Sequence, residues 1–378
     1  MASDHSHGLQ LRTLIKKSGE LELSLVDVPT QAPGPGDIVV RIEGTPINPS
    51  DIGLLFGAAD MSQAKASSNA AGPVITAPVP ERGMVMMAPR LDDSMPAGNE
   101  GAGTVVAAGS DPAAQALIGK KVAILGGAMY AQYRVVSAAS ALPLPDDASA
   151  ADGASCFVNP LTALSMVECM RLENHSAIVH TAAASNLGQM LVKICLKDGV
   201  PLVNIVRSAE QARILTDIGA KYVVDSTSAT FMSDLIAAVT ETNATIAFDA
   251  IGGGKLASQI LTAMEAAAVS KMTAYSRYGS SVMKQVYIYG SLDNSPTELV
   301  RSYGLTWGVS GFLLTPFLGR IGMEGVMRLR ARVVAELKTT FASHYTSEIS
   351  LKDMLDPTIL AAYNRRATGE KYLVNPSL

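Results

Sequence analysis

The chain has few cysteines, with three among 378 residues. Cys156, Cys169 and Cys195 form no C-x-x-C pair, and three cysteines are too few for a disulfide framework. This usage fits a reducing compartment. The N-terminal segment MASDHSHG is polar and carries no apolar run, so it predicts no signal peptide. We therefore expect a cytoplasmic protein.

Long apolar runs and an excess of positive charge are also missing. The most apolar stretch, 304–319, is interrupted by Thr306, Ser310 and Thr315 and is too short to span a bilayer comfortably. The formal net charge of −4 gives no electrostatic footprint for nucleic acid. We therefore expect no membrane and no nucleic acid as partner. The composition, 48% hydrophobic and 17% charged, is that of a globular protein, and the length predicts about two domains.

Three common catalytic signatures are absent from the sequence. It contains no H-E-x-x-H pair, no G-x-S-x-G elbow and no G-x-x-x-x-G-K-S/T phosphate loop. Catalytic zinc needs about three converging His, Cys or carboxylate ligands, and His175, His180 and His344 show no such spacing. The sequence predicts no metal site.

What the sequence does contain is a strand, turn, helix and second strand at 176–207. Residues 177–180 form an apolar run typical of a buried parallel strand, 187–196 carry apolar side chains at helical spacing, and 202–206 form the next strand. This order predicts half of a dinucleotide-binding fold.

The turn of this unit, at 181–185, is made of small residues, which leave room for a phosphate near the amides of a helix start. Of the three glycines in G-x-G-x-x-G only Gly188 is present, in the position that serves helix packing. Two interpretations stay open. Residues 183–188 form either a cofactor turn or a plain connection between strand and helix.

Arg207 directly follows the second strand of the unit. An acid at this place binds the ribose 2′-hydroxyl of NAD, whereas an arginine favours the 2′-phosphate of NADP. A charge-assisted hydrogen bond of about 1.5–3 kcal/mol would favour NADPH over NADH about 10- to 100-fold. The alternative is an ordinary solvated arginine.

Two later strand ends carry further candidate contacts. Asp249 lies at the carboxyl end of a predicted strand, where ligands bind in open α/β sheets, and its alternative role is a helix cap. Tyr289 and Gly290 end the next strand. Their backbone groups either meet a nicotinamide amide or form a plain turn.

The rest of the chain divides into a β-rich part and an α/β part. Alternating residues in 9–47 and glycine-punctuated runs from 96 onward predict a small barrel-like β domain, and 60–96 predicts an irregular insertion or lid. From 208 to 290 helices alternate with strands, which predicts a parallel sheet. A long helix is expected over 323–342.

Several short blocks, taken in chain order, resemble the medium-chain dehydrogenase/reductase superfamily, in particular its zinc-independent quinone oxidoreductases and enoyl thioester reductases. The blocks are INPSD at 47–51, PAGNEGAGTVVAAGS from Pro96, GGAMYAQYRVV around Tyr130, NPLTAL at 159–164, HTAAASNLGQ, LTDIGAKYVVDS and FDAIGG. The resemblance implies an α/β protein with two domains. A GroES-like, β-barrel-type catalytic domain would comprise 1–155 and 315–378, and a Rossmann, doubly wound parallel-sheet domain would bind NADP with 156–314.

The resemblance also implies that a zinc site has been lost. Zinc-dependent relatives place Cys or His where this chain has Ser50 and Asn99, and a Cys near Val158. Oxidation of simple alcohols leans on a Lewis acid and is therefore not expected. A quinone or enone delocalises the charge that hydride addition creates, so hydrogen-bond donors and water suffice.

Two patterns of the family compete in this chain. NPLTAL and VNIVR resemble the enoyl thioester reductases, but the proton-donor tyrosine of those enzymes falls at about Ala59. Quinone reductases usually offer a lysine and a tyrosine to the 2′-phosphate, at the positions of Gln211 and Ser226. Arg207 alone remains for that contact.

The combined prediction is an NADPH-dependent, zinc-independent oxidoreductase that delivers hydride to a small-molecule quinone or α,β-unsaturated carbonyl compound. The alternatives are an enoyl thioester reductase and a non-catalytic NADPH-binding protein. The family implies a homodimer, formed through the strand near Val309. The expected catalytic residues are Asn48 and Tyr130, although packing at a strand end is the alternative role of the tyrosine. The expected cofactor contacts are Asn48, Asn159, Thr162, Ala183, Ala184, Ser185, Asn186, Leu187, Gly188, Arg207, Asp249, Tyr289 and Gly290.

Overall fold

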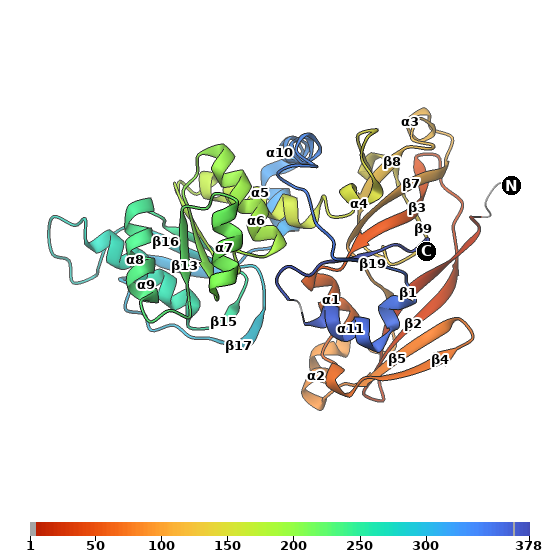
Figure 1. The fold of residues 1–378 in the computed structure, drawn as a ribbon, viewed down its shortest axis with the longest axis horizontal. Coiled ribbons are helices and arrows are strands. Elements are labelled where there is room, and N and C mark those ends of the chain that lie inside the picture. The colour runs from red at the N-terminus through yellow and green to blue at the C-terminus, as the bar shows by residue number, and fades with distance from the viewer. Residues whose placement is uncertain (1–4, 366) are drawn as a thin grey trace. The chain divides into compact units, whose positions relative to one another are not determined.

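The computed structural model describes residues 5–365 and 367–378. The chain forms two compact units, Met1–Val158 with Val334–Leu378, and Asn159–Val333. Figure 1 shows that strands dominate the first unit and that helices surround a sheet in the second. The protein is therefore α/β, with a β-rich unit and a Rossmann-type unit.

Two sheets build the first unit. One has the strand order β4-β5-β2-β1-β6, and the other has the order β10-β8-β7-β3-β20-β19, with β9 also paired to β3. The strands are β1 (His7–Lys16), β2 (Glu20–Pro29), β3 (Asp37–Pro46), β4 (Lys65–Asn69), β5 (Gly72–Pro78), β6 (Ser94–Pro96), β7 (Glu100–Ala108), β8 (Lys121–Leu125), β9 (Tyr133–Ser137), β10 (Leu142–Pro143), β19 (Ser347–Ile349) and β20 (Tyr372–Val374). The helices are α1 (Pro49–Phe56), α2 (Glu81–Met87), α3 (Pro112–Gln115), α4 (Ala150–Gly153) and α11 (Pro357–Asn364), with 3-10 turns η1 (Met61–Gln63), η2 (Ala88–Arg90), η3 (Ala138–Ser140) and η4 (Asp353–Leu355).

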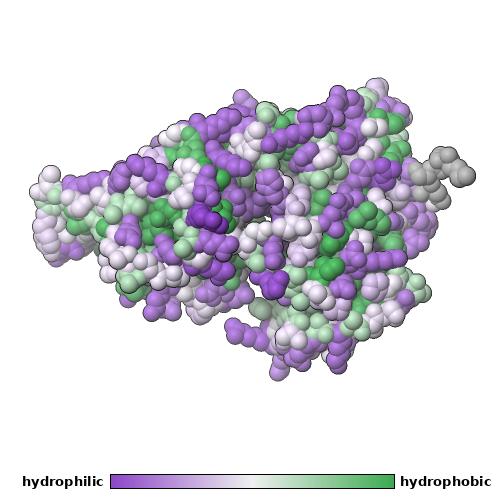
Figure 2. Space-filling model, viewed as in Figure 1, coloured by the Kyte–Doolittle hydropathy of each residue, from purple (hydrophilic) through white to green (hydrophobic). Residues whose placement is uncertain are grey.

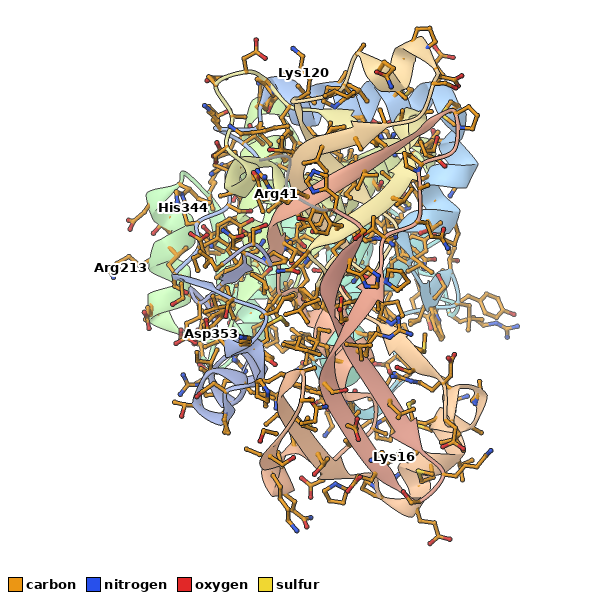
Figure 3. The ribbon with its side chains drawn as sticks, turned by 90° about the vertical axis from the view of Figure 1, so that its right-hand side faces the viewer. Lys16, Arg41, Lys120, Arg213, His344 and Asp353 are labelled. Atoms are coloured by element: carbon orange, nitrogen blue, oxygen red, sulfur yellow. The ribbon has the colours of Figure 1, made fainter. Side chains whose placement is uncertain are left out.

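The β1–β2 hairpin confirms the alternation predicted near the N-terminus. Leu11 pairs with Leu25 across the two strands, and both are at most 1% exposed. Their apolar face packs in one core with residues of α1 and α11, where the rings of Phe56 and Tyr363 stack at 6.1 Å. At the hairpin tip, the Lys16 ammonium lies 2.8 Å from the carboxylates of Glu20 and Glu22 (Figure 3).

The segment 60–96 is more regular than the sequence predicts. β4 and β5 form a hairpin, β5 pairs with β2, and β6 pairs with β1. The prediction of an irregular segment was wrong because β4, with the sequence KASSN, is exposed along its whole length. A strand without a buried face carries no apolar alternation that a sequence pattern could reveal.

The second unit alternates strands with helices, as predicted. Its strands are β11 (Ile178–His180), β12 (Leu202–Val206), β13 (Tyr222–Asp225), β14 (Ile246–Asp249), β15 (Gly252–Gly254), β16 (Lys284–Ile288), β17 (Asp293–Thr297) and β18 (Trp307–Gly311). Its helices are α5 (Val158–Leu172), α6 (Asn186–Asp198), α7 (Ala209–Asp217), α8 (Phe231–Thr242), α9 (Leu256–Val269) and α10 (Leu314–Ala335).

The main sheet of this unit has the strand order β13-β12-β11-β14-β16-β18, and its neighbouring strands are parallel. Numbered within the sheet, this order is 3-2-1-4-5-6, which is that of a dinucleotide-binding fold. From β11 the chain adds β12 and β13 on one side, and it then returns to add β14, β16 and β18 on the other side. The switch in strand order therefore lies between β11 and β14. Ligands of such sheets bind beyond the carboxyl ends of the strands at that point.

Helix α10 belongs to the second unit up to Val333, whereas the sequence predicts the domain boundary at 314/315. Gly322 interrupts the helix with φ +71°. Three ion pairs tie α10 to acids on or next to α5 and α6. They are Arg320–Glu173 at 2.7 Å, Arg328–Glu168 at 2.8 Å and Arg332–Asp198 at 2.8 Å.

A buried ion pair links α9 to β16. The Lys284 ammonium is fully buried and lies 2.6 Å from Glu265 Oε2. The same carboxylate accepts hydrogen bonds from the amide and the hydroxyl of Ser280. Because each buried charge has several partners, the loop before β16 is fixed to the helix.

Hydrophilic residues are spread over the face shown in Figure 2, with smaller hydrophobic areas among them. Across residues 5–365 and 367–378, no helix has both the length and the apolarity needed to cross a membrane.

Candidate functional site

The turn between β11 and α6 is held by its own side chains. Ser185 caps the helix, since its hydroxyl accepts a hydrogen bond from the Gly188 amide at 3.1 Å. Gly188 must be glycine, because an added Cβ would lie 2.1 Å from the Ala183 carbonyl oxygen. Ala182 takes the left-handed φ of +49° that starts the turn.

Small side chains and close backbone packing characterise this turn. Ala183 and Ala184 are buried with side chains of one carbon, and the backbone of the turn packs directly on Gly188. The amides of Ser185 and Gly188 are used within the turn, by Ala182 O and Ser185 Oγ. A phosphate here would thus meet a turn that is already capped.

Arg207 lies at the edge of the same sheet, directly after β12. Its side chain is exposed, and its guanidinium has no ion pair or hydrogen bond within the described residues, whereas its amide donates to Gln211 Oε1 at 3.1 Å. Val206 pairs with Asp225, so Arg207 and Ser226 follow neighbouring strand ends. A free cation beside a serine is suited to hold an anion.

Asp249 is buried, and both of its carboxylate oxygens are used inside the protein. Oδ1 accepts from the Thr181 hydroxyl at 2.7 Å and from the Ile251 amide at 2.9 Å, and Oδ2 accepts from the Gly252 amide at 3.2 Å. Helix α9 begins later, after Lys255. The placement therefore favours a role in shaping the turn after β14 over both a helix cap and a direct ligand contact.

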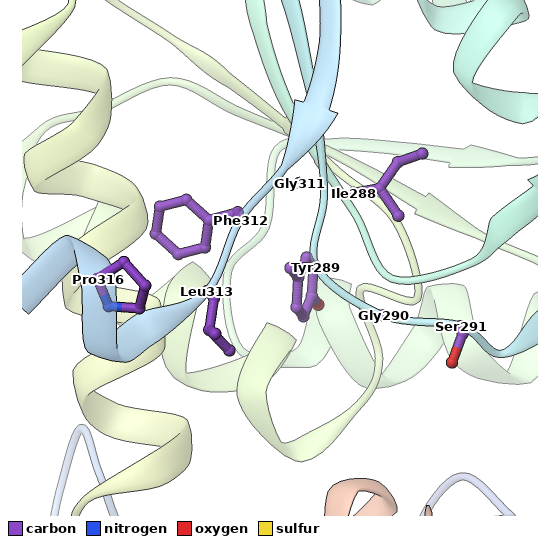
Figure 4. Close-up of a pocket in the computed structure, with 8 residues that line it drawn as sticks. All are labelled: Ile288, Tyr289, Gly290, Ser291, Gly311, Phe312, Leu313 and Pro316. Carbon is purple, nitrogen blue, oxygen red and sulfur yellow. The ribbon is translucent and has the colours of Figure 1, made fainter. Parts of the chain in front are cut away.

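A recess of about 560 Å³ opens at the ends of β16 and β18. Its walls are mainly apolar and come from two chain segments, as Figure 4 shows. The lining residues are Ile288, Tyr289, Gly290, Ser291, Gly311, Phe312, Leu313 and Pro316. Gly290 needs the absence of a side chain, because an added Cβ would lie 2.5 Å from the Ala250 carbonyl oxygen.

The Tyr289 side chain reaches from this recess to a buried histidine on β11. Its hydroxyl lies 2.8 Å from His180 Nε2. His180 is fully buried, and burial lowers its pKa to about 3, so the imidazole is neutral. Desolvation also raises the pKa of the Tyr289 hydroxyl, which stays protonated.

In the first unit, the carboxylate of Glu100 organises the INPSD motif. Glu100 is fully buried; Oε1 accepts from Asn48 Nδ2 at 2.9 Å, and Oε2 accepts from the amides of Phe157 and Val158, both at 2.9 Å. The Asn48 side chain, 3% exposed, is thereby fixed in orientation.

Asp51 and Lys371 complete this buried charge cluster. Asp51 accepts hydrogen bonds from the amides of Asn48 and Asn99, at 2.9 and 2.8 Å. Burial, with a smaller effect from Glu100, raises the pKa of Asp51 to about 7. Burial lowers the pKa of Lys371 to about 8, although the two nearby acids oppose this shift.

Tyr130 lies in the core of the first unit. It is fully buried, and its hydroxyl donates to the Pro46 carbonyl at 3.0 Å. Because its proton is already used and its pKa is raised well above the ordinary value by burial, this placement favours packing over contact with a substrate.

Asn159 and Thr162 lie near the start of α5, and their spacing of three residues puts them on one face. Asn159 is partly exposed, and Thr162 is 8% exposed. Both belong to the second unit, whereas Asn48 belongs to the first.

At the positions where zinc-dependent relatives carry ligands, Asn99 Nδ2 donates to Ser50 Oγ at 2.9 Å. In the part of the chain that the structure describes, no three His, Cys, Asp or Glu side chains are grouped as a metal site would require.

The sequence did not predict the roles of Glu100 and Lys371, nor the link from His180 to Tyr289. Glu100 had a usable signal, because it is an isolated acid within a strand of Gly, Ala and Val. Lys371, which precedes a short buried strand, gave no such signal.

Asp51 should make the stability of the protein depend on pH. Between its ordinary pKa of 3.8 and about 7, the folded protein keeps a proton that the unfolded chain has lost. The free energy of unfolding therefore falls as pH rises through this range, by up to about 1.4 kcal/mol per pH unit from this one group. Urea unfolding of wild type and Asp51→Asn at pH 5, 6 and 7 should show a shallower decline in the variant.

The matched control is Asp146→Asn, which neutralises an exposed acid of the same unit that pairs with a lysine and not with a histidine, and it should keep the wild-type slope. Equal slopes in wild type and Asp51→Asn would contradict the assignment.

Known proteins with similar sequences are reductases. Prostaglandin reductase-3 from Bos taurus is 28% identical over 194 residues, which cover 51% of this chain and 44% of that protein. The mitochondrial enoyl-[acyl-carrier-protein] reductase of Mus musculus is 28% identical over 196 residues, which cover 50% of this chain and 44% of that protein. The chain thus spans about half the length of the curated relatives it matches. No family model matches the chain.

The fold has a close counterpart along its entire length. A provisionally assigned NADPH:quinone reductase from Mesorhizobium loti superposes with a TM-score of 0.73 and 26% identity, over 99% of this chain and all of that one. The shared fold and the two kinds of relative agree with the motif order at 47–51, 96–110 and 159–164. The chain is thus similar in sequence and in fold to such reductases, and these likenesses indicate the quinone and enoyl reductase branch of the medium-chain dehydrogenase/reductase superfamily.

Proposed function

We propose that this protein is an NADPH-dependent, zinc-independent oxidoreductase that transfers hydride to a quinone or an α,β-unsaturated carbonyl compound. The observation that carries the proposal is Arg207, a guanidinium without a partner among the described residues, at the edge of a sheet with the 3-2-1-4-5-6 order. The names of the relatives support the same chemistry.

The cofactor would be held by residues of the second unit. Arg207, with Ser226 on the adjacent strand end, would hold the 2′-phosphate, and the backbone around 183–188 would lie against the pyrophosphate. Asn159, Thr162, Tyr289 and Gly290 would contact the nicotinamide half, and Asp249 would act through the turn it stabilises. NADPH supplies the hydride when it is bound.

The protein's own part in the reaction is positioning. Hydride transfer depends mainly on orientation, so a hydrogen bond from a fixed side chain to the substrate is sufficient help. Asn48, fixed by Glu100 at 2.9 Å, is the candidate for this contact in the first unit. We assign no substrate contact to Tyr130, because its proton is donated to Pro46. The substrate gains the hydride, and water supplies the proton.

A second candidate is an enoyl thioester reductase. It is favoured by the enoyl-[acyl-carrier-protein] reductases among the relatives and by NPLTAL at the start of α5. Ala59 stands where those enzymes carry a tyrosine. The cytoplasm is the compartment we propose, since all three cysteines are free thiols.

Substrate class can be decided with a panel of quinones, conjugated enones and a crotonyl thioester. With NADPH and a metal chelator present, we expect loss of cofactor absorbance with a quinone or an enone. Turnover of the crotonyl thioester alone would identify the protein as an enoyl thioester reductase, the second candidate. NADPH binding without turnover of any compound would leave a non-catalytic binding protein and refute the enzymatic proposal.

Arg207→Ala should reduce the preference for NADPH over NADH. Loss of one charge-assisted hydrogen bond predicts a decrease of about 10- to 100-fold in the ratio of the two dissociation constants. Fluorescence titration with each cofactor measures this ratio directly.

The control for this titration is Arg213→Ala, which removes an exposed arginine from α7 (Figure 3). It should bind both cofactors like wild type. An unchanged preference in Arg207→Ala would remove the role assigned to Arg207.

We further propose a homodimer through β18, the edge strand of the main sheet. Among the strands that the structure describes, β18 pairs only with β16, and Leu305, just before it, is 72% exposed. An open edge beside exposed apolar residues is suited to pair with a second copy.

Light scattering should therefore give twice the chain mass of 39.4 kDa. Leu305→Asp should shift the protein towards the monomer, whereas Leu196→Asp, an exposed position on α6, should not. A wild-type monomer would contradict the dimer.

A further inference from the structure

We propose that His180 and Tyr289 form a positioning pair that presents the Tyr289 hydroxyl, as a hydrogen-bond donor, to a carbonyl oxygen of the ligand in the recess at the ends of β16 and β18. The identity of that ligand rests on the proposed function, whereas the pair itself does not.

The recess offers few groups that could bind a polar atom. Ile288, Phe312, Leu313 and Pro316 supply apolar walls. Figure 4 shows the Tyr289 side chain between the two strand ends, near Leu313. A ligand carbonyl that entered such a surface would need a donor, because an unpaired polar group costs free energy there.

The tyrosine hydroxyl has one partner within the described residues, His180 Nε2 at 2.8 Å. The histidine cannot shift easily. It is fully buried at the end of β11, between the backbones of β12 and β14. The pair therefore has a fixed geometry before any ligand arrives.

The tautomer of His180 decides whether His180 Nε2 or the Tyr289 hydroxyl is the donor of the hydrogen bond between them. His180 Nδ1 is buried and has no hydrogen-bond partner in the described part of the chain. A proton on Nδ1 would leave an orphan N–H donor in the core, whereas a proton on Nε2 leaves only an orphan acceptor. Orphan N–H groups are the rarer and costlier case. Nε2 therefore carries the proton and donates to the Tyr289 oxygen.

This direction frees the tyrosine's own proton. The Tyr289 oxygen accepts from His180, so its O–H can donate to a second group. Burial keeps the hydroxyl protonated, since its pKa is raised. The Tyr289 hydroxyl thus donates a hydrogen bond to a ligand oxygen and does not transfer its proton to it. A neutral carbonyl matches this donor, and it comes either from the carboxamide of a nicotinamide or from the substrate.

The tautomer of His180 can be determined by NMR without any ligand. In protein labelled with ¹⁵N in the imidazole rings, the His180 signals are those that shift in Tyr289→Phe. We expect the chemical shifts of a neutral ring protonated at Nε2. A ring protonated at Nδ1 would overturn the inference, because the tyrosine proton would then be bound to His180.

The ligand contact is tested with Tyr289→Phe, which keeps the ring and removes the hydroxyl. Loss of one neutral hydrogen bond predicts an effect of about 3- to 10-fold. A weaker affinity for NADPH, measured without substrate, identifies the carboxamide. An unchanged affinity with a higher KM or lower kcat for the quinone or enone identifies the substrate carbonyl.

The matched control is Tyr303→Phe. Tyr303 is fully buried in the same unit, and its hydroxyl has no partner among the described residues, so its removal should leave affinity and turnover unchanged. If Tyr289→Phe changes neither NADPH affinity nor turnover by more than twofold, the inference is refuted. If wild type neither binds NADPH nor turns over substrate, the proposed function fails. The tautomer of His180, measured by NMR, still tests the hydrogen-bond direction in the pair.

Discussion

The buried carboxylate of Glu100 is the constraint on which the first unit depends. A fully buried acid must satisfy both of its oxygens, and here the donors are Asn48 and two consecutive backbone amides at the start of α5. The same group therefore sets the orientation of an asparagine on one motif and the entry of the chain into another. The positive charge of Lys371 lies close enough to act on Glu100 and Asp51.

In the second unit, the buried polar groups at the carboxyl edge of the sheet are also paired, but fewer of them are charged. At the carboxyl edge of its sheet, Asp249 ties down the turn after β14, and the neutral His180 holds Tyr289. These residues order the backbone and the side chains at this edge without contributing a free charge. Arg207 differs, since no described group pairs with it. The edge thus combines a neutral, ordered centre with one exposed cation.

The sequence predicted local structure well where the residue pattern reflects the geometry of a strand or a helix. Residues 202–206 were predicted as a strand and form β12, because a strand buried on both faces is apolar throughout. Gly188 was correctly singled out, since close helix packing excludes a side chain there. Local turns and parallel strands therefore follow from the sequence.

Contacts between distant residues were not predictable in this way. The burial of Tyr130 depends on β1 and β3, which are 84 or more residues away from it along the chain. Glu100 and Asn48 are 52 residues apart. No periodicity joins such pairs, so the sequence could suggest chemical candidates but not which hydroxyl or carboxylate is already occupied.

The cap at Ser185 has a consequence for how the protein behaves as cofactor comes and goes. By the spacing of the glycine motif, Ser185 stands where the second glycine would be, and its φ of −64° does not need glycine. A turn made of glycines leaves the helix amides to be satisfied by a bound phosphate. Here a hydroxyl satisfies one of them permanently. Helix α6 therefore keeps an ordered first turn in the free protein, and in the proposed binding mode the gain in stability on loading would be smaller than for an uncapped turn.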